Sequence, residues 1–175
     1  RMLDNLSFSL STDGSINTMN ANLNEFAQPT RYSWLTAFAG KYMNDWLTIS
    51  ASALATIINE DVKEGGSAGN HRKLTPYISA SFKPFYHEEF RIRFFYKDIF
   101  RLPSFNDLYY QEVGNTKLRP ENARQYNVGL TYSKNVCPFL PYLSATIDAY
   151  YNKVTDKIIA YPTKNLAVWL SLIHI

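Results

Sequence analysis

The sequence contains only one cysteine, Cys137, among its 175 residues. A single cysteine excludes an intrachain disulfide framework and a zinc site built from cysteines. No run approaches the ~18 consecutive apolar residues of a membrane-spanning helix, and the apolar periodicity of a helix is nearly absent. If this chain crosses a membrane, it therefore has to cross as strands.

Neither sign of charge dominates, because 18 Lys and Arg are nearly balanced by 15 Asp and Glu, which gives a net charge of +3. This balance argues against a nucleic-acid partner. Charged residues make up 19% of the chain, below the ~25% typical of soluble domains, whereas aromatic residues reach 15%. Such an aromatic surplus requires either a very aromatic core or a membrane interface.

The motifs of common enzymes are missing or incomplete. No phosphate-binding P-loop is present, and His87-Glu88-Glu89 lacks the second histidine of H-E-x-x-H. The stretch from Gly65 to Gly69 matches G-x-S-x-G formally, but charged and glycine-rich residues flank it where a nucleophile elbow needs a strand and a helix. The sequence thus predicts no catalytic residue, no metal site and no cofactor.

What the chain does have is a strict alternation of apolar and polar residues, which is typical of strands. The predicted strands are Leu3–Ser11, Arg31–Met43, Trp46–Ile58, Leu74–Lys83, Glu89–Ile99, Arg124–Lys134 and Tyr142–Asn152. Several exceed the ~5–6 residues usual in soluble sheets and reach the ~9–11 that cross a bilayer on a tilt.

Long and short connections alternate between these strands. Thr12–Thr30, Asn59–Lys73 and Phe100–Ala123 are long, whereas Asn44-Asp45 and Lys83–Glu89 are short. Long loops at one end and short turns at the other are the organisation of an outer-membrane barrel. The sequence predicts an all-β fold, an antiparallel meander that forms about seven strands of a larger transmembrane β-barrel, with long extracellular loops and short periplasmic turns.

The alternation also predicts which face of each strand meets lipid. On the strand from Glu89 the even residues are Phe90, Ile92, Phe94 and Tyr96, while Arg91, Arg93 and Lys97 are odd. A Lys or Arg facing lipid near the midplane would cost ~2–4 kcal/mol, so the even face is predicted to be the outer one. Tyr126, Val128, Leu130 and Tyr132 follow the same rule. A soluble β-sandwich with one face on its own core is the alternative on periodicity alone.

One stretch is more specific than the periodicity. "FRLPSFNDLYY" (Phe100–Tyr110) precedes "GNTKLRPENARQYNVGLTY" (Gly114–Tyr132), and together they closely resemble the barrel of TonB-dependent outer-membrane receptors. The residues that carry the resemblance are Arg101, Pro103, Ser104, Phe105, Asp107, Leu108, Tyr109, Gly114, Asn115, Leu118, Pro120, Glu121, Tyr126, Gly129, Leu130 and Tyr132. Tyr150–Trp169 is also similar to the next strand and loop of these receptors, especially of forms found in Bacteroidetes.

The same residues have a local structural meaning. Pro103 keeps Leu102 out of helical geometry and ends the preceding strand, and Ser104 can cap a short turn. Glu121 can pair with Arg119 or Arg124 where the chain re-enters the sheet. Gly129 leaves room on the inner face, where the family packs a plug.

The resemblance implies that residues 1–169 belong to a barrel of about 22 strands with a plugged lumen. It implies a cell outer membrane location and uptake of a scarce solute, such as an iron-siderophore, cobalamin or glycan. Partners would be outer-membrane lipid, the solute, and TonB with ExbB and ExbD acting through the plug domain. A passive porin-like barrel is the alternative.

Two groups of candidate site residues follow. The loop candidates for ligand binding offer aromatic faces and hydrogen-bonding groups: Arg101, Asn106, Tyr109, Tyr110, Gln111, Tyr161 and Lys164. The candidates that face the lumen or plug are Arg91, Arg93, Lys97 and Asp148.

The final six residues, "LSLIHI" (Leu170–Ile175), match the translation of a transposon-end sequencing adapter. We interpret residues 170–175 as a sequencing-adapter artefact and leave them out of the fold prediction.

Overall fold

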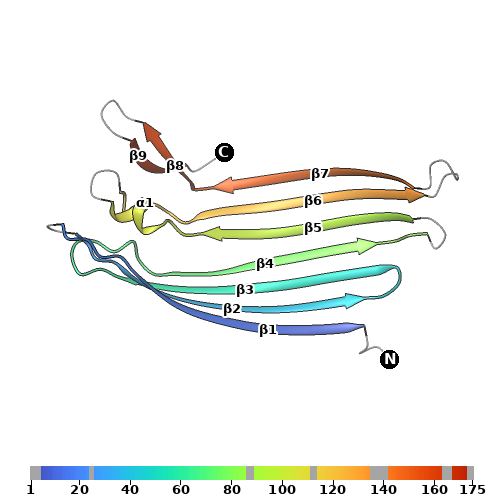
Figure 1. The fold of residues 1–175 in the computed structure, drawn as a ribbon, viewed down its shortest axis with the longest axis horizontal. Coiled ribbons are helices and arrows are strands. Elements are labelled where there is room, and N and C mark those ends of the chain that lie inside the picture. The colour runs from blue at the N-terminus through green and yellow to red at the C-terminus, as the bar shows by residue number, and fades with distance from the viewer. Residues whose placement is uncertain are drawn as a thin grey trace.

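Seven antiparallel strands in sequence order form one open sheet in the computed structural model (Figure 1). Residues 5–23, 26–85, 89–110, 114–134, 142–162 and 167–172 are described, with side chains up to residue 159. The strands are β1 (Leu6–Thr18), β2 (Thr30–Met43), β3 (Leu47–Asp61), β4 (His71–Phe82), β5 (Glu89–Arg101), β6 (Glu121–Lys134) and β7 (Leu143–Thr155). A short helix, α1 (Phe105–Tyr109), lies between β5 and β6, and β8 (Lys157–Pro162) pairs with β9 (Ala167–Leu172).

The observed meander confirms the predicted fold class. Every strand of the large sheet has between 12 and 15 residues, which exceeds the ~9–11 needed to cross a bilayer on a tilt. Short connections join β2 to β3 and β4 to β5, and long ones join β3 to β4 and β5 to β6, as the loop pattern predicts. Among the described residues, no helix has the length and apolar content to span a membrane.

Three local features differ from the sequence prediction. β1 continues to Thr18, because the polar residues after Ser11 pair along β2 as far as Thr18 with Thr30. The loop after β5 contains α1, and the chain after β7 folds back as the β8–β9 hairpin. Of the six residues interpreted as adapter sequence, 170–172 end β9, and 173–175 lie outside the described residues.

The strand registers align the apolar residues of all seven strands on one face. Directly opposed residues point to the same side of an antiparallel pair, and Ile92 opposes Leu130, which in turn opposes Ile147. The same row continues through Phe82 on β4 to Leu47 on β3. This continuous apolar face is solvent-exposed here, as shown by the exposed fractions of Phe8 (63%), Phe38 (53%) and Ile147 (71%). The face predicted from the alternation is therefore confirmed.

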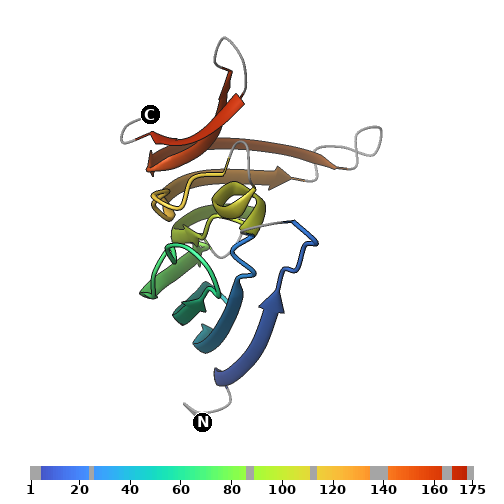
Figure 2. The ribbon, with the colours of Figure 1, turned by 90° about the vertical axis from the view of Figure 1, so that its left-hand side faces the viewer.

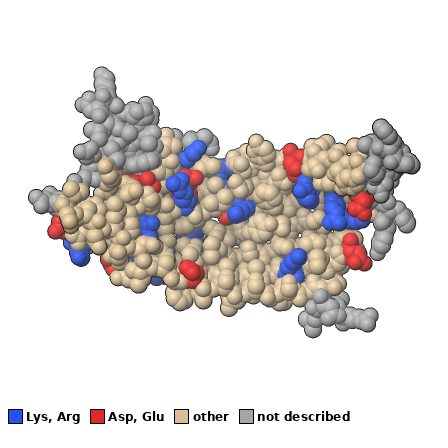
Figure 3. Space-filling view, viewed as in Figure 1, with Lys and Arg blue, Asp and Glu red and all other residues tan. Residues whose placement is uncertain are grey.

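The sheet curves around its polar face. In Figure 2 the strands bend around the side on which α1 lies. Register places Arg91, Arg93, Lys97 and Asp148 on the same face as Glu60, whose carboxylate contacts α1. Figure 3 shows Lys, Arg, Asp and Glu spread along the face that carries α1. The polar face is thus concave and the apolar face convex, which is the curvature of a barrel wall with a polar lumen.

The largest buried cluster among the described residues lies at the loop end of the sheet. It contains Leu108, Tyr109, Leu118 and Ile158, with Phe105 among the partly buried residues packed against it. Within the described residues no second layer of strands packs over either face of the sheet, and β1 and β7 are its outermost strands. The packed part of the loop end is therefore built around α1.

Candidate functional site

Helix α1 is defined by its N-terminal cap. Ser104 Oγ accepts a hydrogen bond from the backbone N–H of Asp107 (3.2 Å), and Asp107 Oδ2 accepts one from the N–H of Ser104 (2.8 Å). This capping box satisfies two backbone donors that would otherwise lack partners. Pro103 precedes it, fully buried, and ends β5. The cap expected at Ser104 is confirmed, and it turns Leu108 and Tyr109 toward the interior.

A tight backbone approach at Gly114 closes the loop after α1. The N–H of Gly114 donates to the carbonyl of Tyr110 at 2.7 Å. A Cβ at Gly114 would lie 2.6 Å from both the nitrogen and the oxygen of Tyr110, so any other residue would force the backbone apart. The N–H of Asn115 then donates to Asp107 O (2.9 Å), which brings the chain back toward β6.

A buried polar cluster joins α1 to the ends of β2 and β3. Glu60 is 5% exposed and accepts hydrogen bonds from the hydroxyl of Tyr109 and from Arg31 Nε, the latter at 2.7 Å. The Arg31 guanidinium lies 4.7 Å from the centre of the Phe105 ring. We call Arg31, Glu60, Phe105 and Tyr109 the loop clamp. A buried carboxylate is costly unless it is paired, and here one neutral donor, Tyr109, and one cation, Arg31, satisfy it.

Tyr109 completes the loop clamp with a second hydrogen bond. Its hydroxyl accepts from the backbone N–H of Ala68 at 3.1 Å, so the β3–β4 loop is tied to the same side chain. Burial, followed by the hydrogen bond to Glu60, raises the pKa of Tyr109 to about 12. The phenol therefore stays protonated, and keeps donating to Glu60, over the whole physiological range.

The ligand-binding candidates from the sequence occupy different environments. Tyr109 is 7% exposed and its hydroxyl is engaged in the loop clamp, whereas Tyr110 is 54% exposed and Asn106 is exposed on α1. Arg101 pairs with Glu121 (3.6 Å), although the sequence predicts Arg119 or Arg124 as the partner of Glu121. Gln111 and Lys164 lie outside the described residues, as does the side chain of Tyr161. Ligand binding by this group stays a prediction.

The pairing of Arg31 with Glu60 was not predicted from the sequence. They are opposed in the β2–β3 register, with Arg31 Nη2 also 2.7 Å from Glu60 Oε2. The predicted strand ended at Ile58, which assigned Glu60 to a loop. Their positions in the sequence could have indicated the pair, because Arg31 begins one predicted strand and Glu60 follows the end of the next. Opposite charges at directly opposed positions of neighbouring strands often pair.

On the concave face an ion pair crosses a whole strand. Arg93 Nη2 on β5 lies 3.1 Å from Asp148 Oδ1 on β7, and Gly129 of β6 stands directly between them in register. A Cβ at Gly129 would meet Asp148 Oδ1 and lie 2.9 Å from Arg93 Nη2. The room that Gly129 leaves on this face is filled here by the pair itself. Arg91 and Lys97 lie on the same strand and face as Arg93.

Small side chains give the concave face shallow grooves. One groove of about 490 Å³ is lined by residues that include Tyr77, Ser79, Ser81, Arg93 and Asp148. Its serine hydroxyls, aromatic ring and ion pair can form hydrogen bonds with a polar surface. In the part of the chain that the structure describes, no cluster of three or more His, Cys, Asp or Glu residues could hold a metal ion.

Long antiparallel strands, an apolar convex face and a polar concave face define the wall of a membrane-type β-barrel. The family described as "TonB dependent receptor-like, beta-barrel" matches residues 11–169, and the chain belongs to this family. The chain is 36% identical over 70 residues to the vitamin B12 transporter BtuB of Vibrio vulnificus, a stretch that covers 40% of this chain and 10% of that protein. It is 32% identical over 66 residues to BtuB of Photobacterium profundum, which covers 38% and 10% of the two proteins. The matched stretches thus span about a tenth of these relatives.

Proposed function

We propose that this chain is part of the barrel wall of an outer-membrane receptor that takes up a scarce solute with energy delivered by TonB. The observation that carries the proposal is the unbroken apolar face across β1 to β7, opposite a polar concave face, in a member of the TonB-dependent receptor barrel family. Lipid would cover the convex face, and the plug and the solute would meet the concave face.

Aromatic residues at both ends of the apolar band support this position in a bilayer. At the turn end Phe90 opposes Tyr132, and at the loop end the ring centroids of Tyr96 and Tyr126 lie 5.0 Å apart. Tyr96 comes six positions after Phe90, which corresponds to ~20 Å along a strand at ~3.4 Å per residue. A band of about 25 Å between two aromatic girdles is typical of outer-membrane barrels.

The loop clamp gives the loop end a fixed part and an adaptable part. Tyr109 is held by Glu60 and Ala68, so α1 is anchored to the barrel rim. Tyr110, Asn106 and Arg101 are exposed beside it and are the described residues proposed to contact the solute. A rigid anchor lowers the entropy cost of presenting these side chains to a ligand.

Transport itself would depend on parts of the receptor beyond this wall. TonB, driven by ExbB and ExbD, would pull on the plug and open a path along the concave face. Arg91, Arg93, Lys97 and Asp148 would form the polar contacts of that face with plug or solute. Charged contacts in a wet interface are individually weak, which suits a surface that must be released in each cycle.

Among the solute classes implied by the family resemblance, a cobalamin is the first to test, because the two relatives reported above are both named vitamin B12 transporters. The test uses the full-length receptor in a cobalamin-requiring strain that lacks its own receptor. We expect uptake of labelled cyanocobalamin that requires TonB and stops when the proton gradient is collapsed. Uptake that continues without TonB would indicate a passive porin-like barrel and overturn the proposal. Tight binding of a ferric siderophore or a glycan instead would change the solute and leave energised transport standing.

A further inference from the structure

The sheet opens between β4 and β5 toward the loop end. Their ladder joins residues 77–82 of β4 to residues 92–97 of β5, although both strands continue beyond it. The next residue of β4 is Pro76, which has no N–H to donate to a ladder. Closer to the loops the strands meet again through side chains, because the ring centroids of His71 and Phe100 lie 6.5 Å apart. A window therefore remains in the wall between Pro76 and this ring pair (Figure 1).

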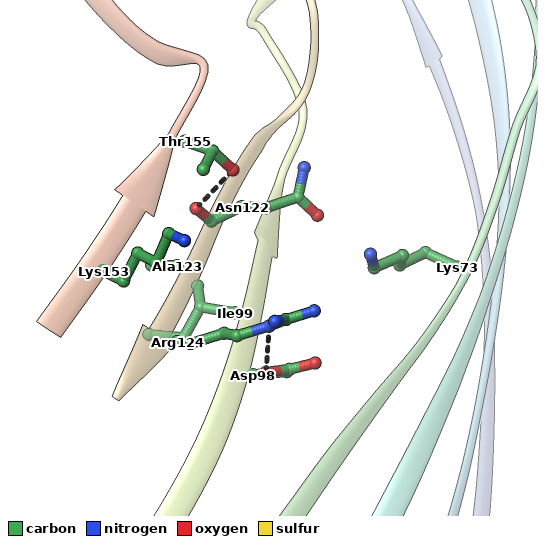
Figure 4. A pocket seen from close by; sticks show the side chains of 8 residues that line it. All are labelled: Lys73, Asp98, Ile99, Asn122, Ala123, Arg124, Lys153 and Thr155. Atoms are coloured by element: carbon green, nitrogen blue, oxygen red, sulfur yellow. Dashed lines mark hydrogen bonds and ion pairs between the residues drawn. The ribbon is translucent and has the colours of Figure 1, made fainter. Parts of the chain in front are cut away.

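The window holds a cavity of about 240 Å³ that reaches both faces of the sheet. Lys73 and Ile99 line the cavity and belong to the concave face by register. Arg124 and Lys153 line it as well and belong to the convex face. A ligand in this cavity therefore lies within the thickness of the wall, with β4 on one side and β5 to β7 on the other (Figure 4).

Cations approach the window from both of its sides. Lys73 points across it from β4 toward Arg124 on β6, and Lys153 approaches from β7 (Figure 4). The carboxylate in the lining, Asp98, already accepts from Tyr96 (2.5 Å) and pairs with Arg124 (3.7 Å). Lys73 and Lys153 form no ion pair with any residue that the structure describes. Three cations and one engaged carboxylate leave the window with a net charge of +2.

An unused acceptor sets a second requirement for a ligand. The side-chain amide of Asn122 donates through Nδ2 to the carbonyl of Pro120 (3.0 Å), which fixes its orientation. Its Oδ1 is buried, points into the window on the side of Lys73, and has no hydrogen-bond partner within the described residues (Figure 4). Buried polar atoms without partners are rare in native proteins and call for a ligand or water.

These two requirements select among small anions. The ligand has to balance two positive charges and also present a hydrogen-bond donor to Asn122. At neutral pH a phosphate ion keeps at least one hydroxyl, so it donates one hydrogen bond while its other oxygens accept from Lys and Arg. Sulfate carries no hydroxyl at this pH, and a carboxylate has a single charge and no donor. Hydrogen phosphate is therefore the simplest ion that meets both requirements.

We propose that the window binds a soluble hydrogen phosphate ion, held by Lys73 from one side and by Arg124 and Lys153 from the other, with Asn122 Oδ1 accepting from its hydroxyl. The ion offsets the repulsion between these cations. It also bridges β4 to β5–β7 at the height where the ladder is missing. The inference goes beyond the transport proposal and does not depend on it, since binding is measured without uptake.

The first test is calorimetric titration of the full-length receptor, purified in detergent without phosphate, at neutral pH. Sodium phosphate and sodium sulfate are compared at equal ionic strength, because screening alone alters exposed charges. We expect saturable phosphate binding and about tenfold weaker sulfate binding, since sulfate places a second acceptor against Asn122 Oδ1. Equal affinities for the two ions, or no saturable binding of phosphate, would overturn the proposal.

Variants then test each side of the window. Lys73→Gln should lower the affinity for phosphate about tenfold, because a charged hydrogen bond is lost. An unchanged affinity would show that no ion is held between the two sides. Asn122→Ala should bind phosphate and sulfate with similar affinities, and retained discrimination would reject the role of its Oδ1. Lys134→Gln is the matched control, since Lys134 is an exposed cation on β6 at the opposite end, and it should bind as the unmodified receptor does.

Amide hydrogen exchange tests the bridge itself. Saturating phosphate should slow exchange in residues 71–76 of β4, where the ladder with β5 is missing, and leave β2 unchanged. The same exchange with and without phosphate would overturn the bridging. Dihexanoyl phosphatidic acid, a soluble lipid, distinguishes the source of the phosphate group: binding of this lipid without binding of the free ion would reject the proposal. Failed TonB-dependent uptake with intact phosphate binding rejects only the transport proposal.

Discussion

The hydroxyl of Tyr109 donates a hydrogen bond to the buried carboxylate of Glu60, which lies 49 residues earlier in the chain. This contact joins the most family-specific stretch of the sequence to the end of β3. Arg31 neutralises the same carboxylate from β2, and Ala68 donates to the hydroxyl of Tyr109 from the β3–β4 loop. Two loops and two strands thus meet at the Tyr109–Glu60 pair. This structural role accounts for a tyrosine at this point of the motif.

Replacing Tyr109 with phenylalanine should loosen α1 without unfolding the sheet. The change leaves one acceptor of the buried Glu60 carboxylate unpaired, which costs about 1–3 kcal/mol. Amide hydrogen exchange of the full-length receptor should speed up in α1 and around Ala68, while β2 keeps its protection. Tyr110→Phe is the matched control, since Tyr110 is 54% exposed, and it should leave exchange unchanged. Equal exchange in both variants would show that the loop clamp contributes nothing to the order of the loops.

The loop clamp should also depend on pH in one direction. Burial and the bond to Glu60 raise the pKa of Tyr109 from 10 to about 12, so the neutral phenol is favoured in the folded state. Its contribution is complete below pH 10 and is lost as the pH rises through about 12, and a shift of this size corresponds to about 3 kcal/mol. Subtracting the absorbance titration of Tyr109→Phe from that of the unmodified receptor should isolate an ionisation near pH 12. In Glu60→Gln the pKa of Tyr109 should move part of the way back toward 10. An ionisation of Tyr109 near pH 10 in the unmodified receptor would contradict the hydrogen bond.

An alanine at Gly129 should push Arg93 and Asp148 apart. Its methyl group would occupy the space between the two side chains, and overpacking of this kind costs about 1–3 kcal/mol. The ion pair itself contributes little, because both side chains are more than 40% exposed. Urea unfolding of the full-length receptor should show a lower midpoint for Gly129→Ala than for Gly66→Ala, a position with open space around it.

A second background makes the Gly129 prediction specific. In Asp148→Ala one of the two colliding groups is absent, so adding Gly129→Ala should cost clearly less than it does in the unmodified receptor. The same cost in both backgrounds would mean that the glycine is needed for the backbone of β6 and not for the ion pair.

Arginine substitutions on the two faces of β6 should differ in how much they lower the stability of the receptor. Val128 lies in the middle of the apolar band and is 49% exposed, whereas its neighbour Asn127 points to the concave face. Val128→Arg should cost ~2–4 kcal/mol in a bilayer, and Asn127→Arg should cost much less. Urea unfolding of the receptor from lipid vesicles measures both. Similar costs for the two variants would refute the assignment of the convex face to lipid.

Local pattern was enough to predict much of this fold. The alternation along β5 and β6 predicted their faces, and the registers confirm them. The "PSFND" stretch predicted a capped turn, and Ser104 and Asp107 form a capping box. Both signals depend on residues within a few positions of one another, so they can be read without knowing what lies across the sheet.

Other features could not be predicted because they depend on contacts distant in sequence. The polar residues of β1 after Ser11 form a strand only because β2 pairs with them. Arg101 pairs with Glu121 rather than with another acid, because the β5–β6 register sets them opposite each other. Among the ligand candidates, the burial of Tyr109 could not be foreseen either, since Glu60 approaches it from another loop.

Pattern along the chain was sufficient to assign the class of this protein, from a period of two over long strands, a surplus of aromatic residues and a family-specific motif between β5 and β6. These properties are local, and each is set by side-chain chemistry along a single strand. Contacts across the sheet, in contrast, were needed to show that Tyr109 belongs to the loop clamp, that Gly129 makes room for Arg93 and Asp148, and that the β4–β5 ladder stops at Tyr77. These depend on register, which fixes which side chains meet across strands and which positions, such as Pro76, cannot continue a ladder.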